Sequence, residues 1–265
     1  MRLLHCITLE LHEFVDTEVP GYAILSHRWE RDEVSFQDMR SGDAKRKAGY
    51  SKIVGCVKQA LAEDCEYIWV DTCCIDKSSS AELSEAINSM YRWYQYANVC
   101  LVHLSNVSSW PEESFQQSQW HRRGWTLQEL IAPAVVLFYT NDWYLLGTKE
   151  SLQKFITEET GVYREILLGE EDVRAISIAW RMSWAAGRET TRVEDLAYCL
   201  MGIFDMNMPL LYGESNKAFI RLQEEIMKSS DGHTLSTWRN DDGMEDSESP
   251  YGLLASSPSR FKNSG

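Results

Sequence analysis

The sequence predicts an α/β protein with a doubly wound, mainly parallel sheet flanked by helices. Three features of residues 20–140 lead to this prediction. Short apolar runs alternate with helical patterns four times, long segments separate successive runs, and polar residues follow the ends of the first two runs. Parallel neighbours in a sheet need long crossover connections, which are usually helices. The order of elements along the chain therefore favours parallel strand pairs.

The first strand, helix and second strand are predicted between residues 22 and 71. Residues 22–26 are an apolar run after a Pro-Gly pair, and residues 67–71 are another that ends in a carboxylate. Residues 50–63 place their apolar side chains at helical spacing. Residues 30–49 are charged and irregular, which favours a loop or a frayed helix. Strand, helix and strand in this order predict a βαβ unit with a right-handed crossover.

The remaining strands are predicted over residues 99–104 and 134–139, after a helix over residues 81–97 and a short helix over residues 122–133. Loops are predicted over residues 72–80 and 105–119. Pro133 is expected to end the short helix because proline lacks the N–H that a helix needs. Four predicted strands then lie in one sheet.

The chain is expected to divide into three parts. Residues 1–145 form the sheet domain, residues 146–228 form a C-terminal helical extension, and residues 229–265 form a linker or tail cut from a longer protein. The extension has helical patterns over residues 149–159, 191–200 and 215–227, and Thr191 to Glu194 has the form of a capping box.

Composition and charge exclude several classes of function. The formal net charge is −14, which argues against binding to nucleic acids and to anionic membrane surfaces. The apolar run over residues 131–138 is too short to span a bilayer, and the N-terminus has no signal-peptide pattern. The seven cysteines are scattered, and the adjacent Cys73 and Cys74 fit one tetrahedral metal ion poorly. We therefore expect a cytoplasmic protein with thiols in place of disulfides and with no metal site.

Trp125 and Glu129 are the most informative pair of residues. They are four apart in a predicted helix, so they are expected to share one helical face. A carboxylate beside an indole lies against an apolar wall, and the flat ring could support a flat ligand. The alternative is that Trp125 anchors the core and Glu129 is a solvated or ion-paired surface group.

Four stretches resemble the heterokaryon incompatibility (HET) domain of filamentous fungi. They occur in the family's order and cover most of residues 1–228, as Tyr22-Ala-Ile-Leu-Ser-His-Arg-Trp29, Ile68-Trp-Val-Asp-Thr-Cys-Cys-Ile-Asp-Lys77, Arg123-Gly-Trp-Thr-Leu-Gln-Glu129 and Asn207-Met-Pro-Leu-Leu-Tyr-Gly-Glu214. The likeness is greatest to the version at the N-terminus of large NLR-type receptors. Glu30 and Ser215 stand where this family often has glycine.

The HET family is in turn similar to TIR domains, which implies a TIR-like, flavodoxin-like sheet. TIR enzymes that cleave NAD carry a Trp-Cys-x-x-Glu segment with an essential Glu, and the matching positions here are Trp125, Thr126 and Glu129, with Thr in place of Cys. The resemblance therefore implies an NAD glycohydrolase with Glu129 as its catalytic residue. The sequence has no Gly-x-Gly-x-x-Gly fingerprint, so NAD is expected as a substrate and no stored cofactor is expected.

The chemistry of NAD cleavage is compatible with a single carboxylate. Nicotinamide leaves as a neutral molecule, so no general acid is needed, and Glu129 would stabilise the oxocarbenium-like transition state. The residues expected to bind the substrate are Ser26, His27, Arg28, Trp29, Asp71, Asp76, Arg122, Arg123 and Trp125. The arginines would hold the pyrophosphate, and the two loops at strand ends would frame the site.

Structural roles remain open for several of these residues. Ser26 could cap a helix, His27 could be a buried hydrogen-bonded histidine, Asp71 and Asp76 could order their loop, and Trp29 could pack in the core.

Two hypotheses on function follow from the resemblance. The first is a cell-death effector that hydrolyses NAD once it has self-associated, with NLR or repeat domains downstream. The second is a homotypic signalling adaptor with no turnover.

Overall fold

The structure is a computed structural model that describes residues 1–108, 112–229 and 254–264. The chain forms two compact units. The first comprises residues 1–120 and 129–152, and the second comprises residues 121–128 and the chain from residue 153 onward. The chain therefore leaves the first unit at residue 121, returns at Glu129, and leaves it again at residue 153.

The first unit is built on a seven-stranded sheet in the order β2-β1-β4-β3-β5-β6-β7. Its four central strands run parallel and are β4 (Tyr67–Trp69), β3 (Ala23–His27), β5 (Val99–His103) and β6 (Val136–Tyr139). All four lie inside or within one residue of the predicted strands. The prediction of an α/β fold with a mainly parallel sheet is confirmed.

Three antiparallel strands extend this core and make the sheet mixed. They are β1 (Arg2–His5), β2 (Leu11–Glu13) and β7 (Leu145–Thr148). The sequence did not predict them, and their burial explains why. Only the two central residues of β1 are buried, and β2 and β7 have none, so none of the three has the apolar run of a central strand.

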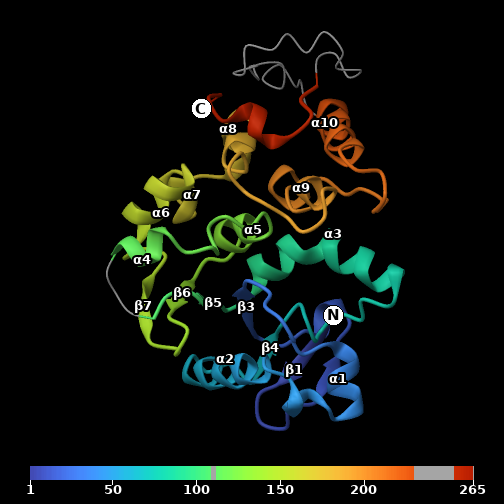
Figure 1. The fold of residues 1–265 in the computed structure, drawn as a ribbon, viewed down its shortest axis with the longest axis vertical. Helices are drawn as coiled ribbons and strands as arrows, with labels where there is room; N and C mark the ends of the chain where they lie inside the picture. The colour runs from blue at the N-terminus through green and yellow to red at the C-terminus, as the bar shows by residue number, and fades with distance from the viewer. Residues whose placement is uncertain (109–111, 230–253, 265) are drawn as a thin grey trace. The chain divides into compact units, whose positions relative to one another are not determined.

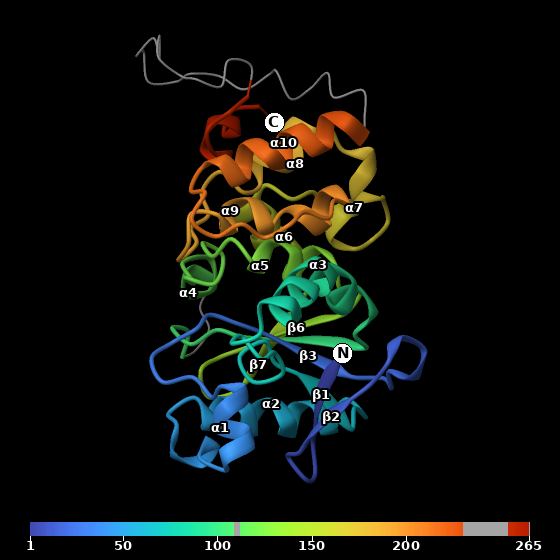
Figure 2. The ribbon, with the colours of Figure 1, turned by 90° about the vertical axis from the view of Figure 1, so that its right-hand side faces the viewer.

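Helices cover both faces of the sheet, with α2 (Tyr50–Ala62) on one face and α3 (Ser80–Tyr96) on the other (Figures 1 and 2). Both were predicted, because their buried residues follow helical spacing. The first unit also contains α1 (Phe36–Ser41), α4 (Glu112–Gln116), the second half of α5 (Thr126–Ile131), and 3-10 turns at Asp16–Glu18 and Ala44–Arg46. In α1, Ser35 and Asp38 form a capping box inside a stretch expected to be irregular.

Gly55, which has no side chain, lets α2 lie close to the chain after β6. A Cβ atom added to Gly55 would lie 2.0 Å from Nε1 of Trp143, so the indole occupies the space that any other residue would fill. Trp143 itself packs against His103 at the end of β5, with ring centroids 4.8 Å apart. Trp143 therefore lies between α2 and the end of β5.

The second unit is helical, as expected for the C-terminal extension. It contains α6 (Gln153–Thr160), α7 (Arg164–Leu167), α8 (Ile178–Ser183), α9 (Asp195–Tyr198), α10 (Lys217–Ser229), and 3-10 turns at Val173–Ala175, Met201–Phe204 and Pro258–Phe261. The described residues include no helix that is long and apolar enough to cross a membrane.

Glu194 has a different role from the predicted capping box. It stands at the N-cap of α9 without a side-chain cap, and its Oε1 accepts hydrogen bonds of 2.9 Å from the N–H groups of Gly213 and Ser215. Its own backbone N–H, followed by those of Ser215 and Gly213, holds the pKa of Glu194 below its usual value. Ser215 has a φ of 57°, a left-handed conformation that glycine adopts more readily. The family's preference for glycine here therefore has a steric reason.

The region predicted as a linker or tail is partly folded. Residues 230–253 and 265 lie outside the described residues. Ala255 is fully buried and exchanges two hydrogen bonds with the buried side chain of Gln223, at 2.8 and 3.0 Å. The turn at Pro258–Phe261 packs against α8. Residues 254–264 therefore belong to the second unit and differ from the expected linker.

Candidate functional site

Glu129 is a buried side chain of the first unit, with 6% of its surface exposed. Its Oε2 accepts a hydrogen bond of 2.5 Å from Oγ of Ser26, which is fully buried in β3. The two residues were predicted from stretches 103 positions apart, and the structure brings them together. The alternative of a solvated surface group does not fit Glu129.

Trp120 completes this contact and was not predicted. Its Nε1 donates a hydrogen bond of 2.8 Å to Oγ of Ser26, and its side chain is 1% exposed. The indole packs edge-on against Phe138 of β6, with centroids 5.7 Å apart. Ser26 thus lies between an indole N–H and a carboxylate.

Two further groups face Glu129 from neighbouring elements. Tyr94 of α3 donates its hydroxyl proton to the carbonyl of Leu25 at 3.0 Å, and its phenol lies close to the Glu129 side chain. Burial, followed by the charge of Glu129, holds the pKa of Tyr94 well above its usual value. Cys100 of β5 donates its thiol to the Glu129 carbonyl at 3.8 Å, and burial together with the Glu129 charge raises its pKa. Both groups stay neutral near physiological pH.

Lys149 holds the C-terminal end of α5. It is 4% exposed, and its Nζ donates to the carbonyls of Pro133 at 2.5 Å and Leu130 at 3.3 Å. These carbonyls follow Glu129 in the chain, so the ammonium group meets the orphan acceptors of a helix end. Burial lowers the pKa of Lys149 to about 8. The sequence did not single out this lysine.

His27 lies on the opposite face of β3 from Ser26, because successive side chains of a strand alternate. Its Nε2 is 3.9 Å from Oε1 of Glu33 and 3.9 Å from Oδ1 of Asp71. Nζ of Lys52, on α2, is 2.5 Å from the same oxygen of Glu33. These residues form a cluster of titratable side chains beside α2, in which Lys52 and Glu33 are the ion pair.

Trp29 and Arg28 continue from this cluster. The indole of Trp29 donates a hydrogen bond of 2.7 Å to Oδ2 of Asp71, and Nζ of Lys77 lies 3.6 Å from the ring centroid. The guanidinium of Arg28 donates to the side-chain amide of Gln119. Trp29 is 41% exposed, so core packing does not describe it.

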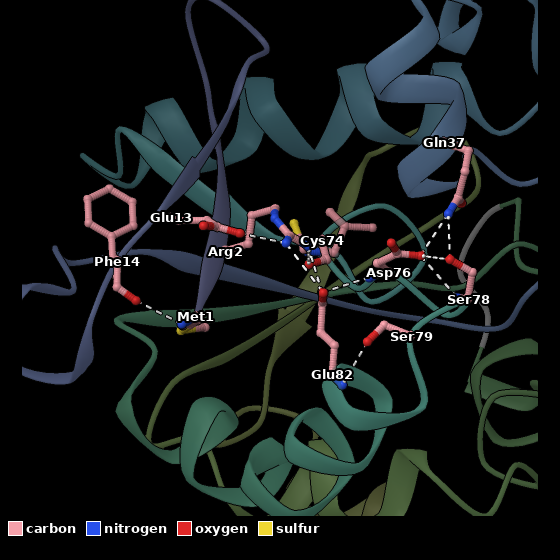
Figure 3. Close-up of polar contacts among 11 residues, drawn as sticks. Met1, Arg2, Glu13, Phe14, Gln37, Cys74, Asp76, Ser78, Ser79 and Glu82 are labelled. Atoms are coloured by element: carbon pink, nitrogen blue, oxygen red, sulfur yellow. Dashed lines mark hydrogen bonds and ion pairs between the residues drawn. The ribbon is translucent and has the colours of Figure 1, made fainter.

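Asp76 organises its own loop, as Figure 3 shows. Its Oδ1 accepts hydrogen bonds from Ser78 Oγ at 2.6 Å and from Gln37 Nε2 at 2.7 Å. Its backbone N–H donates to Glu82, which is also paired with Arg2 at 2.6 Å. These contacts fit the loop-ordering alternative, and a role in substrate binding stays a prediction.

Trp125, Arg122 and Arg123 belong to the second unit. Trp125 stands directly before α5, which begins at Thr126, so the helical face that it was expected to share with Glu129 stays a prediction. A β-bridge between Arg123 and Glu189 holds the preceding backbone extended.

The indole of Trp125 hydrogen-bonds with the Asp195 carboxylate, which also accepts from the Tyr212 hydroxyl at 3.0 Å. Burial nevertheless raises the pKa of Asp195. The carbonyls of Arg122 and Arg123 accept from the backbone of Glu189 and the side chain of Arg188. How these three residues relate to NAD stays a prediction.

Comparison with known proteins places the chain in a family. Residues 22–112 match the family model described as heterokaryon incompatibility protein (HET), a range that runs from β3 to the start of α4. The vegetative incompatibility protein HET-E-1 of Podospora anserina is 47% identical over 224 residues. The chain carries a HET domain.

The match covers most of this chain but only a small part of the relative. The aligned residues are 80% of this chain but 16% of HET-E-1, so the chain spans a small part of its relative's length. No solved structure matches this HET domain. The resemblance to the HET family is therefore confirmed, whereas the TIR-like arrangement stays a prediction.

Proposed function

We propose that this HET domain is the cell-death effector of a fungal incompatibility protein and acts by hydrolysing NAD. The observation that carries the proposal is the Glu129 carboxylate, which is buried beside the end of a parallel strand and accepts a hydrogen bond from Ser26. Ligands of open α/β sheets bind at the carboxyl ends of such strands. The name of the related Podospora protein supports the incompatibility role.

The reaction needs one carboxylate and one water molecule. The bond between C1′ of the ribose and the nicotinamide nitrogen breaks, and its electron pair neutralises the pyridinium as nicotinamide leaves. Glu129 stabilises the positive charge that develops on the ribose. Water then attacks C1′ and releases a proton, which gives ADP-ribose.

Activation by self-association fits the burial of Glu129. A side chain that is 6% exposed offers little surface to a ribose in the resting chain. We expect assembly to open access to the carboxylate, so that the isolated domain turns over slowly. The arginines at positions 28, 122 and 123 are the proposed donors to the pyrophosphate.

Nicotinamide release from NAD tests the proposal directly. The assembled protein is incubated with NAD, with Glu129→Gln and the matched control Glu85→Gln, an exposed residue of α3. We expect Glu129→Gln to lower the rate by roughly 100-fold or more, as loss of a charge-stabilising group does, and Glu85→Gln to match wild type. Equal release by Glu129→Gln and wild type would overturn the enzymatic proposal.

A homotypic adaptor is the second candidate, and the same low exposure of Glu129 favours it. In that case NAD would not raise the melting temperature of the domain. Charge reversals on the surface would abolish signalling, while Glu129→Gln would signal normally. The two candidates therefore differ in the effect of one substitution in cells.

A further inference from the structure

We propose that Trp120 is a positioning residue for the Glu129 carboxylate and that it acts through the hydroxyl of Ser26. The three side chains form a chain of two hydrogen bonds, from Trp120 Nε1 to Ser26 Oγ at 2.8 Å and from Ser26 Oγ to Glu129 Oε2 at 2.5 Å. The inference rests on the proposed function where activity is its readout, and it names the groups that prepare the carboxylate.

The chemistry of the donors fixes the direction of both hydrogen bonds. An indole N–H can only donate, so Ser26 Oγ must accept from Trp120. A serine hydroxyl has one proton, and with the indole on one side that proton points to Glu129. The only proton that the Ser26 side chain can donate is therefore already donated to Glu129. Ser26 is accordingly a positioning residue, whereas the sequence predicted that it binds substrate.

The fixed direction favours the ionised form of Glu129. A hydrogen bond donated to a carboxylate stabilises its charge, whereas burial favours the neutral acid. Without the indole N–H, the Ser26 hydroxyl could rotate and accept a proton from a neutral Glu129. Trp120 removes that option, and the proposed reaction needs the negative charge.

The surroundings hold the indole in place. Trp120 is 1% exposed, packs edge-on against Phe138, and its backbone N–H donates to Ser118 Oγ at 3.3 Å. Ser26 is equally fixed, because its neighbours in β3 are paired with β5 in register. The geometry of the two hydrogen bonds is therefore set by the sheet and its packing.

Three titratable groups near Glu129 do not change charge in the acid range. Tyr94 from α3 and Cys100 from β5 have raised pKa values and stay neutral there. Lys149, whose ammonium group donates to the nearby α5 carbonyls, loses its proton only at about pH 8. The Asp71 carboxylate also acts on Tyr94, so the Glu129 titration has to be read from the Glu129 carboxyl signal itself.

The decisive experiment measures the titration of Glu129 in the absence of NAD. Protein with ¹³C-labelled glutamate is titrated by NMR, and the Glu129 carboxyl signal is identified by its loss in Glu129→Gln. We expect the midpoint to rise by about one pH unit in Trp120→Phe and in Ser26→Ala, as loss of one charge-assisted hydrogen bond implies. The matched control is Trp143→Phe, which removes an indole N–H on the opposite face of the sheet.

A double variant tests whether Trp120 acts on Glu129 through Ser26, here called the relay, or independently of Ser26. If Trp120 acts through Ser26, Trp120→Phe combined with Ser26→Ala shifts the midpoint no further than Ser26→Ala alone. An additive shift, or an unchanged midpoint in Trp120→Phe, overturns the proposal. Should Trp120→Phe fail to fold, an unchanged midpoint in Ser26→Ala overturns it as well.

Activity gives a second readout that a merely structural role would not produce. We expect the acid limb of kcat to move up with the NMR midpoint in Trp120→Phe while KM stays within about twofold of wild type. If the variants show the NMR shifts but the wild-type protein never cleaves NAD, the proposed function is contradicted and the relay still stands. Cleavage of NAD without any NMR shift would contradict the relay alone.

Discussion

The two faces of β3 are built on different electrostatic principles, although Ser26 and His27 are consecutive residues. On the α3 face, Glu129 accepts a hydrogen bond from the neutral hydroxyl of Ser26 and lies beside the Tyr94 phenol, which also stays neutral. On the α2 face, the Glu33 carboxylate is paired with the Lys52 ammonium group, and His27 lies between two carboxylates. One face presents a carboxylate to neutral partners, and the other pairs the Glu33 carboxylate with an ammonium group.

This difference suggests how the two faces divide their roles. Neutral donors can orient a carboxylate without cancelling its charge, which leaves the charge able to act on a ligand. Buried ion pairs resist disruption, because removal of one partner strands the other charge. We expect substitutions on the α3 face to change activity and substitutions on the α2 face to change stability.

The largest effect is expected for Glu33→Ala on the α2 face. The Lys52 side chain is 6% exposed and would lose the carboxylate that lies 2.5 Å away. We expect the free energy of unfolding to fall by about 3–5 kcal/mol, measured by urea denaturation. The control is Glu13→Ala, whose carboxylate is 74% exposed and should cost less than about 1 kcal/mol. Equal losses of unfolding free energy in Glu33→Ala and Glu13→Ala would contradict the stabilising role assigned to the α2 face.

A pH-dependent effect is expected from Lys149 on the α3 face. Its folded pKa of about 8 is below its ordinary value of 10.5, so between these values the unfolded chain binds more protons. The free energy of unfolding of the wild type, relative to Lys149→Met, should therefore rise with pH from about 8 to 10.5. The rise should be at most about 3 kcal/mol, measured by urea denaturation across this range. A flat difference would mean that the lysine is not buried as a cation.

The smallest effect is expected for Lys77→Ala, which removes an ammonium group from above the Trp29 ring. A cation–π contact at an exposed site contributes about 0.5–1 kcal/mol, so the melting temperature should fall only slightly. Lys58→Ala on α2, an exposed lysine, serves as the control. If Lys77→Ala lowered the free energy of unfolding as much as Glu33→Ala, the exposed edge of the α2 face would contribute as much to stability as its buried centre.

The sequence predicted the parallel core because each of β3, β4, β5 and β6 is a mainly buried apolar run. It could not predict Trp120, whose partner Ser26 is 94 residues away and whose own neighbours are polar. Lys149 was missed for a similar reason, since its carbonyl partners become available only when α5 ends beside it. Both residues depend on contacts that no local pattern encodes.

Trp125 shows a different limit of the sequence. Its spacing to Glu129 is helical, but the structure starts α5 one residue later, at Thr126, and the Trp125 indole hydrogen-bonds with Asp195 of the second unit. This partner comes from a distant part of the chain, and no local pattern predicts it. Of the three hydrogen-bonded side chains at Glu129, the sequence singled out the acid and the serine and missed Trp120, which donates to the serine.

Gly55 has a spectroscopic consequence. Because the Trp143 indole fills the hollow left by this glycine, lifting α2 from the sheet would release the ring into water. Its fluorescence would then shift to longer wavelength while the helix itself remained intact. The difference in emission between the wild type and Trp143→Phe would separate this ring from the other nine tryptophans and would report on the α2 face.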